Sequence, residues 1–106
     1  MPAYNKLVRD RIPEIIKNDG KTPKTRILND EEYRSELFKK IVEEAQEVAS
    51  APNKNALLKE LGDVLEVVDA MIKANDLDAN EVTRVKNERR LSRGVFDKRV
   101  FLESAD

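Results

Sequence analysis

The chain contains no cysteine and no histidine among its 106 residues. The absence of cysteine excludes disulfide bonds, thiol catalysis and zinc–thiolate sites. The absence of histidine removes the usual general base and the usual zinc ligand, so any metal site must be built from oxygen donors. Aromatic side chains are also few, with two tyrosines and three phenylalanines. The sequence therefore offers little for stacking against a planar ligand.

Long hydrophobic runs are missing as well. No stretch of apolar residues is long enough to cross a membrane, and Met1 to Lys6 lack the apolar segment of a signal peptide. We therefore expect a cytoplasmic protein without a membrane partner. The length suits one small domain with a single modest core, and we expect residues 1–106 to form that domain.

Charged residues make up 39% of the sequence and are distributed unevenly. Residues 1–26 carry a net charge of +4, residues 27–81 a net charge of −8, and residues 82–106 a net charge of +3. A site for a metal ion and a polyphosphate would have this pattern, with metal ligands in the acidic centre and phosphate-binding cations at the ends. A small, highly charged protein also has patches without any site, and charge alone does not separate the two interpretations.

The first half of the sequence predicts two helices. A short helix begins at Pro13, a residue suited to a first turn, and ends near Gly20. Asn29 and Glu32 have the spacing of a capping box and predict the start of a long helix. That helix runs to about residue 51, because Pro52 prevents its continuation.

The second half predicts two more helices and completes an all-α protein. Residues 53–55 form a tight connector, so a helix over residues 56–75 should fold back antiparallel to the preceding one. Asp78 and Glu81 have the spacing of a second capping box, for a helix that ends around Gly94.

Four carboxylates at matched spacings form the most informative pattern in the sequence. Glu44 and Glu47 lie three residues apart on one expected helix, and Glu60 and Asp63 lie three apart on the next. Residues at this spacing are neighbours on a helix surface, so antiparallel helices can bring the four acids to one place. A divalent cation would relieve their repulsion, and carboxylate oxygens are ligands that Mg²⁺ prefers.

The position of Glu60 on its helix supports a functional role. On a helical wheel Glu60 lies within about 20° of two apolar residues, while Glu44 borders the apolar stripe of its own helix. Two alternatives compete with a metal site: the acids are paired with lysine or arginine, or they lie on a solvated face. Lys59 and Lys73 point away from Glu60 on the wheel, so the geometry favours a metal or another cationic ligand.

These motifs resemble a known family. The segment Glu44-Ala45-Gln46-Glu47, twelve intervening residues and the segment Glu60-Leu61-Gly62-Asp63 follow an E-x-x-E, spacer, E-x-x-D pattern. This pattern is similar to that of the MazG-like, phosphoribosyl-ATP pyrophosphohydrolase-like branch of the all-α nucleoside triphosphate pyrophosphohydrolases. Residues 4–14 resemble the opening of one subgroup, and Arg93-Gly94-Val95-Phe96 resembles its closing R-G-x-F. The resemblance covers nearly the whole chain.

The resemblance implies a small helical bundle completed by dimerisation, as a homodimer or a dimer of dimers. It implies cleavage of a (d)NTP or related nucleotide between its α and β phosphates, dependent on Mg²⁺ or Mn²⁺, as in house-cleaning enzymes. The metal ligands that it implies are Glu44, Glu47, Glu60 and Asp63. Two alternatives stay open: the phosphoribosyl-ATP pyrophosphohydrolase of histidine synthesis, and a non-catalytic nucleotide-binding or regulatory module.

Hydrolysis requires a proton acceptor and cations that bind the phosphates. In the absence of histidine a carboxylate is the natural acceptor, and Glu47 and Glu43 are both candidates. Candidate phosphate-binding side chains come from both ends of the chain: Lys6, Arg9, Arg11, Lys86, Arg89, Arg90 and Arg93. Lys6 and Arg9 have the stronger case because the resemblance covers them. We expect the replacement of Arg9 to change nucleotide kinetics while metal binding without nucleotide stays unchanged.

The helix expected over residues 56–75 is apolar around more than half of its circumference. The neighbouring helices of the same chain cannot cover that much surface, so we expect a symmetric partner. Residues 95–102 mix aromatic and charged side chains and are expected to pack on the core or on a partner. A net charge of −1 and the lack of a DNA-binding motif disfavour nucleic acid as a ligand.

Overall fold

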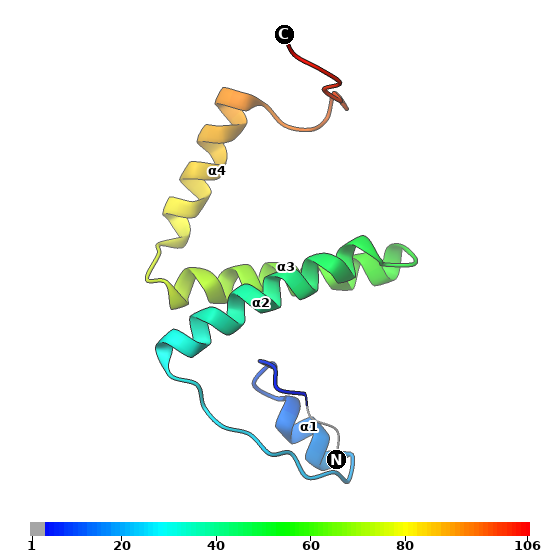
Figure 1. The fold of residues 1–106 in the computed structure, drawn as a ribbon, viewed down its shortest axis with the longest axis vertical. Coiled ribbons are helices and arrows are strands. Elements are labelled where there is room, and N and C mark those ends of the chain that lie inside the picture. The colour runs from blue at the N-terminus through cyan, green and yellow to red at the C-terminus, as the bar shows by residue number, and fades with distance from the viewer. Residues whose placement is uncertain (1–3) are drawn as a thin grey trace. The chain divides into compact units, whose positions relative to one another are not determined.

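A computed structural model describes residues 4–106, which form four α-helices joined by loops (Figure 1). The helices are α1 (Ile12–Asn18), α2 (Asp30–Ala49), α3 (Lys54–Ala74) and α4 (Ala79–Arg93). The described residues contain no β-strand, which confirms the predicted all-α fold. No helix in this part of the chain combines the length and apolarity that crossing a membrane requires.

The chain divides into two compact units. The first ends at Asp76 and contains α1, α2 and α3, whereas the second runs from Leu77 to Asp106 and contains α4. The expectation of one domain over residues 1–106 stays a prediction.

Side-chain hydrogen bonds define the start of α2. Asn29 Oδ1 accepts a hydrogen bond from the Glu32 backbone N–H at 2.9 Å, and Glu32 Oε1 accepts one from the Asn29 N–H at 3.4 Å. This is the predicted capping box, and it satisfies two backbone donors at once. Arg26 reinforces it with an ion pair to Glu32 at 2.9 Å. The helix ends at Ala49, before the proline that was expected to stop it.

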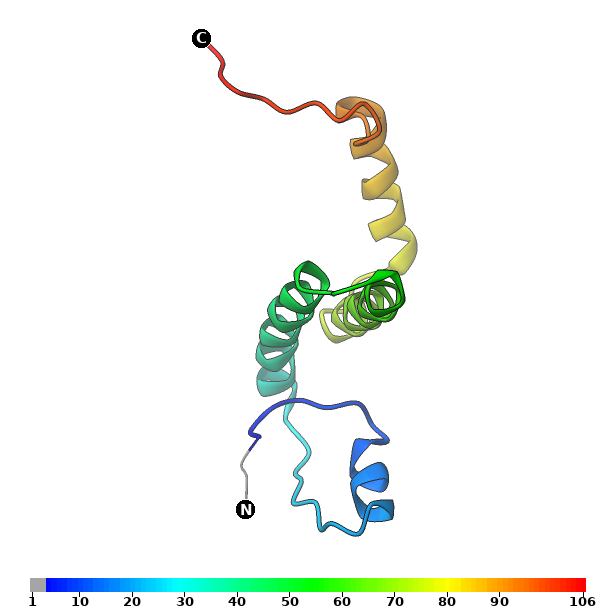
Figure 2. The same cartoon turned by 90° about the vertical axis from the view of Figure 1, so that its right-hand side faces the viewer.

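Helix α3 begins earlier than the sequence predicts, at Lys54 instead of Ala56. The reason is Asn53, whose Oδ1 accepts a hydrogen bond from the Ala56 N–H at 2.9 Å and caps the helix. The connector is correspondingly short, and α2 and α3 form the predicted antiparallel hairpin. The two helices pack side by side in both views (Figures 1 and 2).

Helix α4 begins at the predicted residue Asp78, but the cap there is a simple aspartate cap and not the predicted capping box. Asp78 Oδ1 accepts a hydrogen bond from the Asn80 N–H at 2.8 Å, whereas Glu81 pairs with Arg84 at 2.8 Å instead of completing a capping box. The helix ends where predicted, because Gly94 adopts a φ of 85°, which glycine reaches without steric cost. Beyond it Phe96 is 97% exposed, and the expected packing of this tail on the core or on a partner stays a prediction.

The hydrophobic core of the described residues is small. Leu37 of α2 and Val67 of α3 are its only buried hydrophobic side chains. Phe38, the neighbour of Leu37 in α2, is more than half exposed. On α3, Leu58 and Leu65 are 73% and 64% exposed. Considerable apolar surface of the hairpin is therefore left uncovered within the first compact unit.

Candidate metal centre

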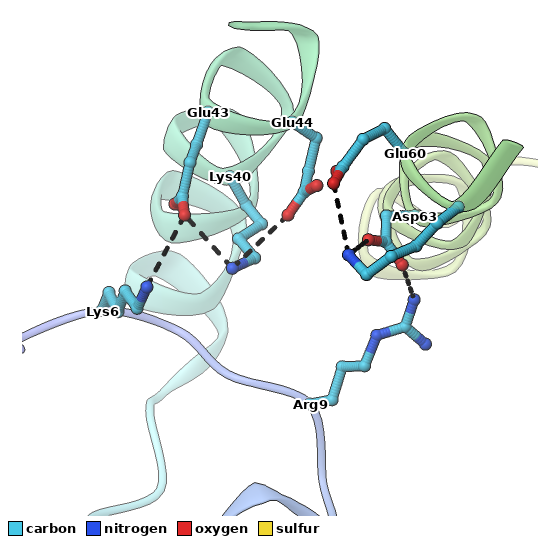
Figure 3. A network of polar contacts seen from close by, with 8 residues as sticks. Lys6, Arg9, Lys40, Glu43, Glu44, Glu60 and Asp63 are labelled. Atoms are coloured by element: carbon cyan, nitrogen blue, oxygen red, sulfur yellow. Dashed lines mark hydrogen bonds and ion pairs between the residues drawn. The ribbon is translucent and has the colours of Figure 1, made fainter. Parts of the chain in front are cut away.

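The α2–α3 hairpin brings together three of the four carboxylates that the sequence singles out. One carboxylate oxygen from each of Glu44, Glu47 and Glu60 lies within 4.8 Å of the others. Glu44 and Glu60 come from the two facing helices, and Figure 3 shows their carboxylates pointing toward each other. We call these three residues the carboxylate cluster.

Two members of the carboxylate cluster are unusually buried for acids. Glu44 is 7% exposed, and the side chain of Glu60 is 14% exposed. The Oε2 atom of each is buried and has no hydrogen-bond partner. Burying an ionised oxygen without a partner is costly, and a cation between the helices would remove that cost.

The donor set of the carboxylate cluster fits a hard divalent cation. All three ligands are carboxylate oxygens, the donors that Mg²⁺ and Mn²⁺ prefer. Around an octahedral Mg²⁺ the ligand oxygens lie about 2.9–4.2 Å apart, a separation that follows from metal–oxygen distances of about 2.1 Å. The separations of up to 4.8 Å are close to that range, so small side-chain movements would let the three oxygens bind one ion together with water.

Glu47 is the exposed member of the carboxylate cluster. Its pKa is raised above the ordinary value of 4.5, first because its protonated carboxyl can hydrogen-bond to Glu60, and then because the charges of Glu44 and Glu60 repel its own. In the metal-free protein Glu47 therefore holds a proton more tightly than an isolated glutamate does.

Asp63, the fourth expected ligand, is held by two cations of the chain itself. Lys59 Nζ donates a hydrogen bond to its Oδ2 at 2.9 Å, and Arg9 Nη2 donates one to its Oδ1 at 2.7 Å. The bond from Lys59 and, secondarily, the bond from Arg9 lower the pKa of Asp63 below its ordinary value of 3.8. Asp63 is thus an ionised carboxylate beside the cluster whose two oxygens are already engaged.

The helical wheel was wrong about Lys59, whose long side chain reaches back to its neighbour. Lys59 Nζ lies 3.3 Å from Glu60 Oε1, so pairing with lysine coexists with the unpartnered Oε2 of the same carboxylate. On α2 Lys40 pairs in the same way with acids of its own helix, since its Nζ lies 3.6 Å from Glu44 Oε1 and 3.8 Å from Glu43 Oε2. Sequence reasoning missed both lysines, although each precedes an acid of the motif by four residues, a spacing that brings side chains together on a helix.

The segment before α1 carries two of the expected phosphate-binding cations to the same region. Lys6 Nζ lies 3.6 Å from Glu43 Oε1, and Arg9 reaches Asp63 (Figure 3). Arg11 does not join them, because it pairs with Glu14 at 3.1 Å.

The other expected phosphate-binding residues belong to the second compact unit. They are exposed side chains of α4: Lys86, Arg89, Arg90 and Arg93. Their contact with phosphate stays a prediction.

Comparison with known proteins adds an independent observation. Residues 5–90 match the model of a protein family described as phosphoribosyl-ATP pyrophosphohydrolase. An uncharacterized protein of Mycolicibacterium smegmatis (strain ATCC 700084 / mc(2)155) is 47% identical over 53 residues, which are 50% of this chain and 54% of that protein. The chain thus spans about half the length of this relative. No solved structure matches the chain.

Proposed function

Because the chain belongs to the phosphoribosyl-ATP pyrophosphohydrolase family, we propose that it hydrolyses a nucleotide between its α and β phosphates with the help of a divalent cation, Mg²⁺ or Mn²⁺. The observation that carries the proposal is the pair of buried, unpartnered oxygens of Glu44 and Glu60 at the hairpin interface. A protein that only packed these helices together would gain stability by placing apolar residues there.

In the proposed site Glu44, Glu47 and Glu60 hold the cation, with Asp63 as the fourth ligand. Bound there, the ion would neutralise charge on the phosphates and lower the pKa of a coordinated water. The water oxygen forms a bond to the α phosphorus, the bond from that phosphorus to the bridging oxygen breaks, and the products are a nucleoside monophosphate and pyrophosphate.

Glu47 is the better of the two candidates for the proton acceptor. Its exposure and its place among the proposed ligands suit a group that must take a proton from a coordinated water and release it to solvent. Glu43 lies outside the carboxylate cluster and faces two ammonium groups, those of Lys6 and Lys40. We therefore assign the base to Glu47.

Lys6 and Arg9 are the proposed phosphate-binding residues of the first compact unit. Both reach acids that flank the carboxylate cluster, so both lie within a side chain's length of a nucleotide bound to the metal. Guanidinium and ammonium groups bind phosphate oxygens through charge-assisted hydrogen bonds.

Two substrates deserve direct comparison. The family description names phosphoribosyl-ATP, whereas the wider family that the sequence resembles also includes enzymes that act on (d)NTPs. Both molecules present the same linkage between α and β phosphates, so the site chemistry serves either.

The proposal is tested by measuring pyrophosphate release from (d)NTPs and phosphoribosyl-ATP, with and without Mg²⁺. We expect turnover that requires the metal and disappears in Glu60→Gln. Removing this ligand should weaken divalent binding more than the roughly 10–100-fold that is typical of outer-shell changes. Glu66→Gln, an exposed acid on the same helix, is the control and should behave as wild type. Nucleotide binding without product would identify a non-catalytic module, and undiminished Mg²⁺ affinity of Glu60→Gln would refute the metal site.

A further inference from the structure

One short segment connects the acids of both helices. The segment of residues 4–11, which we call the N-terminal strap, places Lys6 on Glu43 of α2 and Arg9 on Asp63 of α3. Figure 3 shows the strap passing the carboxylate cluster, with each of these side chains directed at a different helix. Three residues of extended chain span about 10 Å, enough to bridge two packed helices.

The strap occupies the carboxylate that the metal would need as its fourth ligand. Both oxygens of Asp63 are engaged, one by Arg9 and the other by Lys59. By contrast, Glu44 and Glu60 each keep one buried oxygen without a partner. Glu44 and Glu60 thus each offer an oxygen to a cation, whereas Asp63 is closed by the Arg9 guanidinium and the Lys59 ammonium.

We propose that Arg9 is an internal competitor of the divalent cation for Asp63, and that metal loading releases the strap. This inference rests on the proposed function. In the metal-free protein Arg9 and Lys59 each neutralise one oxygen of Asp63. When a cation takes Asp63 as a ligand, Arg9 loses its partner and becomes available to a phosphate, which a guanidinium binds with the same forked geometry as a carboxylate.

The energetics allow this exchange. Arg9 is 57% exposed and Asp63 23% exposed, and an ion pair at such a surface contributes little to stability. A divalent ion that gains a fourth carboxylate can therefore displace the guanidinium. Since coupling between two ligands is reciprocal, metal binding should tighten nucleotide binding by the same factor by which nucleotide tightens metal binding.

The first test is calorimetric titration of the whole protein with Mn²⁺ in the absence of nucleotide. Arg9→Gln removes the competitor and should bind Mn²⁺ about threefold to tenfold more tightly than wild type, the range expected for losing a surface ion pair and a nearby positive charge. Arg26→Gln, which removes another exposed arginine from its pair with Glu32, is the matched control and should leave the affinity unchanged.

The second test follows the strap directly in the wild-type protein. Trypsin cleaves after lysine and arginine only when the side chain is free to enter its specificity pocket. Mn²⁺ should accelerate cleavage after Arg9 by about threefold or more, because cleavage follows the population of the open form. Cleavage after Arg26 in the same reaction is the internal reference, and Glu60→Gln should show no acceleration.

The outcomes separate the two proposals. Mn²⁺ binding that is lost in Glu60→Gln but unchanged in Arg9→Gln, without faster cleavage of the strap, would overturn the competition while leaving the metal site intact. The absence of any divalent binding to wild type would overturn both.

Discussion

Glu47 combines solvent exposure with a raised pKa, and this combination makes the metal-free protein sensitive to pH. Glu44 and Glu60 disfavour its ionised form, so the folded state binds the Glu47 proton more tightly than the unfolded state does. The contribution of this group to stability is full below its unfolded pKa and is lost as pH rises through the raised folded value. The ordinary pKa of 4.5 sets the lower edge of that window.

Replacing Glu47 by glutamine should remove this pH dependence. Without metal, Glu47→Gln should melt at a higher temperature than wild type at neutral pH, and the difference should vanish on acidification through the window. Melting curves in a chelator between about pH 4 and about pH 8 would show this, with Glu66→Gln as the control. If the melting temperatures of Glu47→Gln and wild type change with pH in the same way, Glu47 does not interact with Glu44 and Glu60.

Arg9 links the strap to catalysis. Replacing it by alanine should lower kcat/KM for nucleotide by about tenfold, the typical value of one charge-assisted hydrogen bond. The Arg26→Ala variant is the control for the loss of an exposed arginine. Normal kinetics together with a lowered melting temperature would instead mean that Arg9 only stabilises the folded position of the N-terminal segment. Kinetics and melting should be measured on one preparation of each variant.

At the residue scale, sequence reasoning found the buried acids but not their partners. Helical periodicity places Glu44 and Glu60 toward the hairpin interface, and their low exposure confirms that placement. A helical wheel describes where a side chain starts, not how far it reaches, so Lys59 was assigned to the wrong direction. The ion pair of Arg9 with Asp63 spans 54 positions of the sequence, and no local pattern could have revealed it. That pair also removes the basis for expecting metal binding to be independent of Arg9.

At the scale of the elements, the N-terminus of α2 depends on one reciprocal cap. Replacing Asn29 by alanine removes the acceptor for the Glu32 N–H and should lower the free energy of unfolding by about 1 kcal/mol. For a chain of this size that corresponds to a drop in melting temperature of about 4–8 °C. Asn55→Ala, an exposed position inside the first turn of α3, should change stability little. Equal melting temperatures for Asn29→Ala and wild type would show that the cap adds nothing.

The helix boundaries show which sequence signals are sufficient to locate the start of a helix. An asparagine followed by glutamate three residues later was enough to locate the start of α2. The start of α3 was placed two residues late, because Asn53 was assigned to the connector when it is the cap. Asp78 was found as a cap, but its partner was wrong, since an aspartate reaches the backbone of Asn80 while Glu81 is drawn to Arg84. Caps are readable from sequence, whereas the competition among nearby charged side chains is decided by geometry.

At the scale of the whole molecule, the uncovered apolar surface of the hairpin calls for a partner. Two buried hydrophobic side chains among residues 4–106 are a small core for a chain of 106 residues. Leu58 and Leu65 lie seven residues apart on α3, a spacing that puts them on one face of the helix. We therefore keep the prediction that a second copy packs on this face to form a homodimer, alone or within a dimer of dimers.

The dimer is testable by light scattering, which should return at least twice the chain mass at micromolar concentration. Leu65→Glu places a charge on the apolar face where the second copy is predicted to pack. It should therefore shift the protein to the monomer or, if the hairpin is unstable without its partner, reduce the helicity. Ile27→Glu changes an equally apolar side chain that is exposed in the loop before α2, and should leave the mass unchanged. A monomeric wild type would contradict the prediction.

The α2–α3 hairpin also determines the order in which the site is assembled during folding. Only twelve residues separate Glu47 from Glu60, so the chain entropy lost in closing that loop is small, and contacts between near neighbours in sequence form fast. The contact between Arg9 and Asp63 closes a much longer loop and follows later. A newly made chain should therefore pass through a stage in which the carboxylates have already converged and the strap has not yet arrived. A cation that enters at that stage meets no competing guanidinium, so the protein would be loaded most rapidly while it folds.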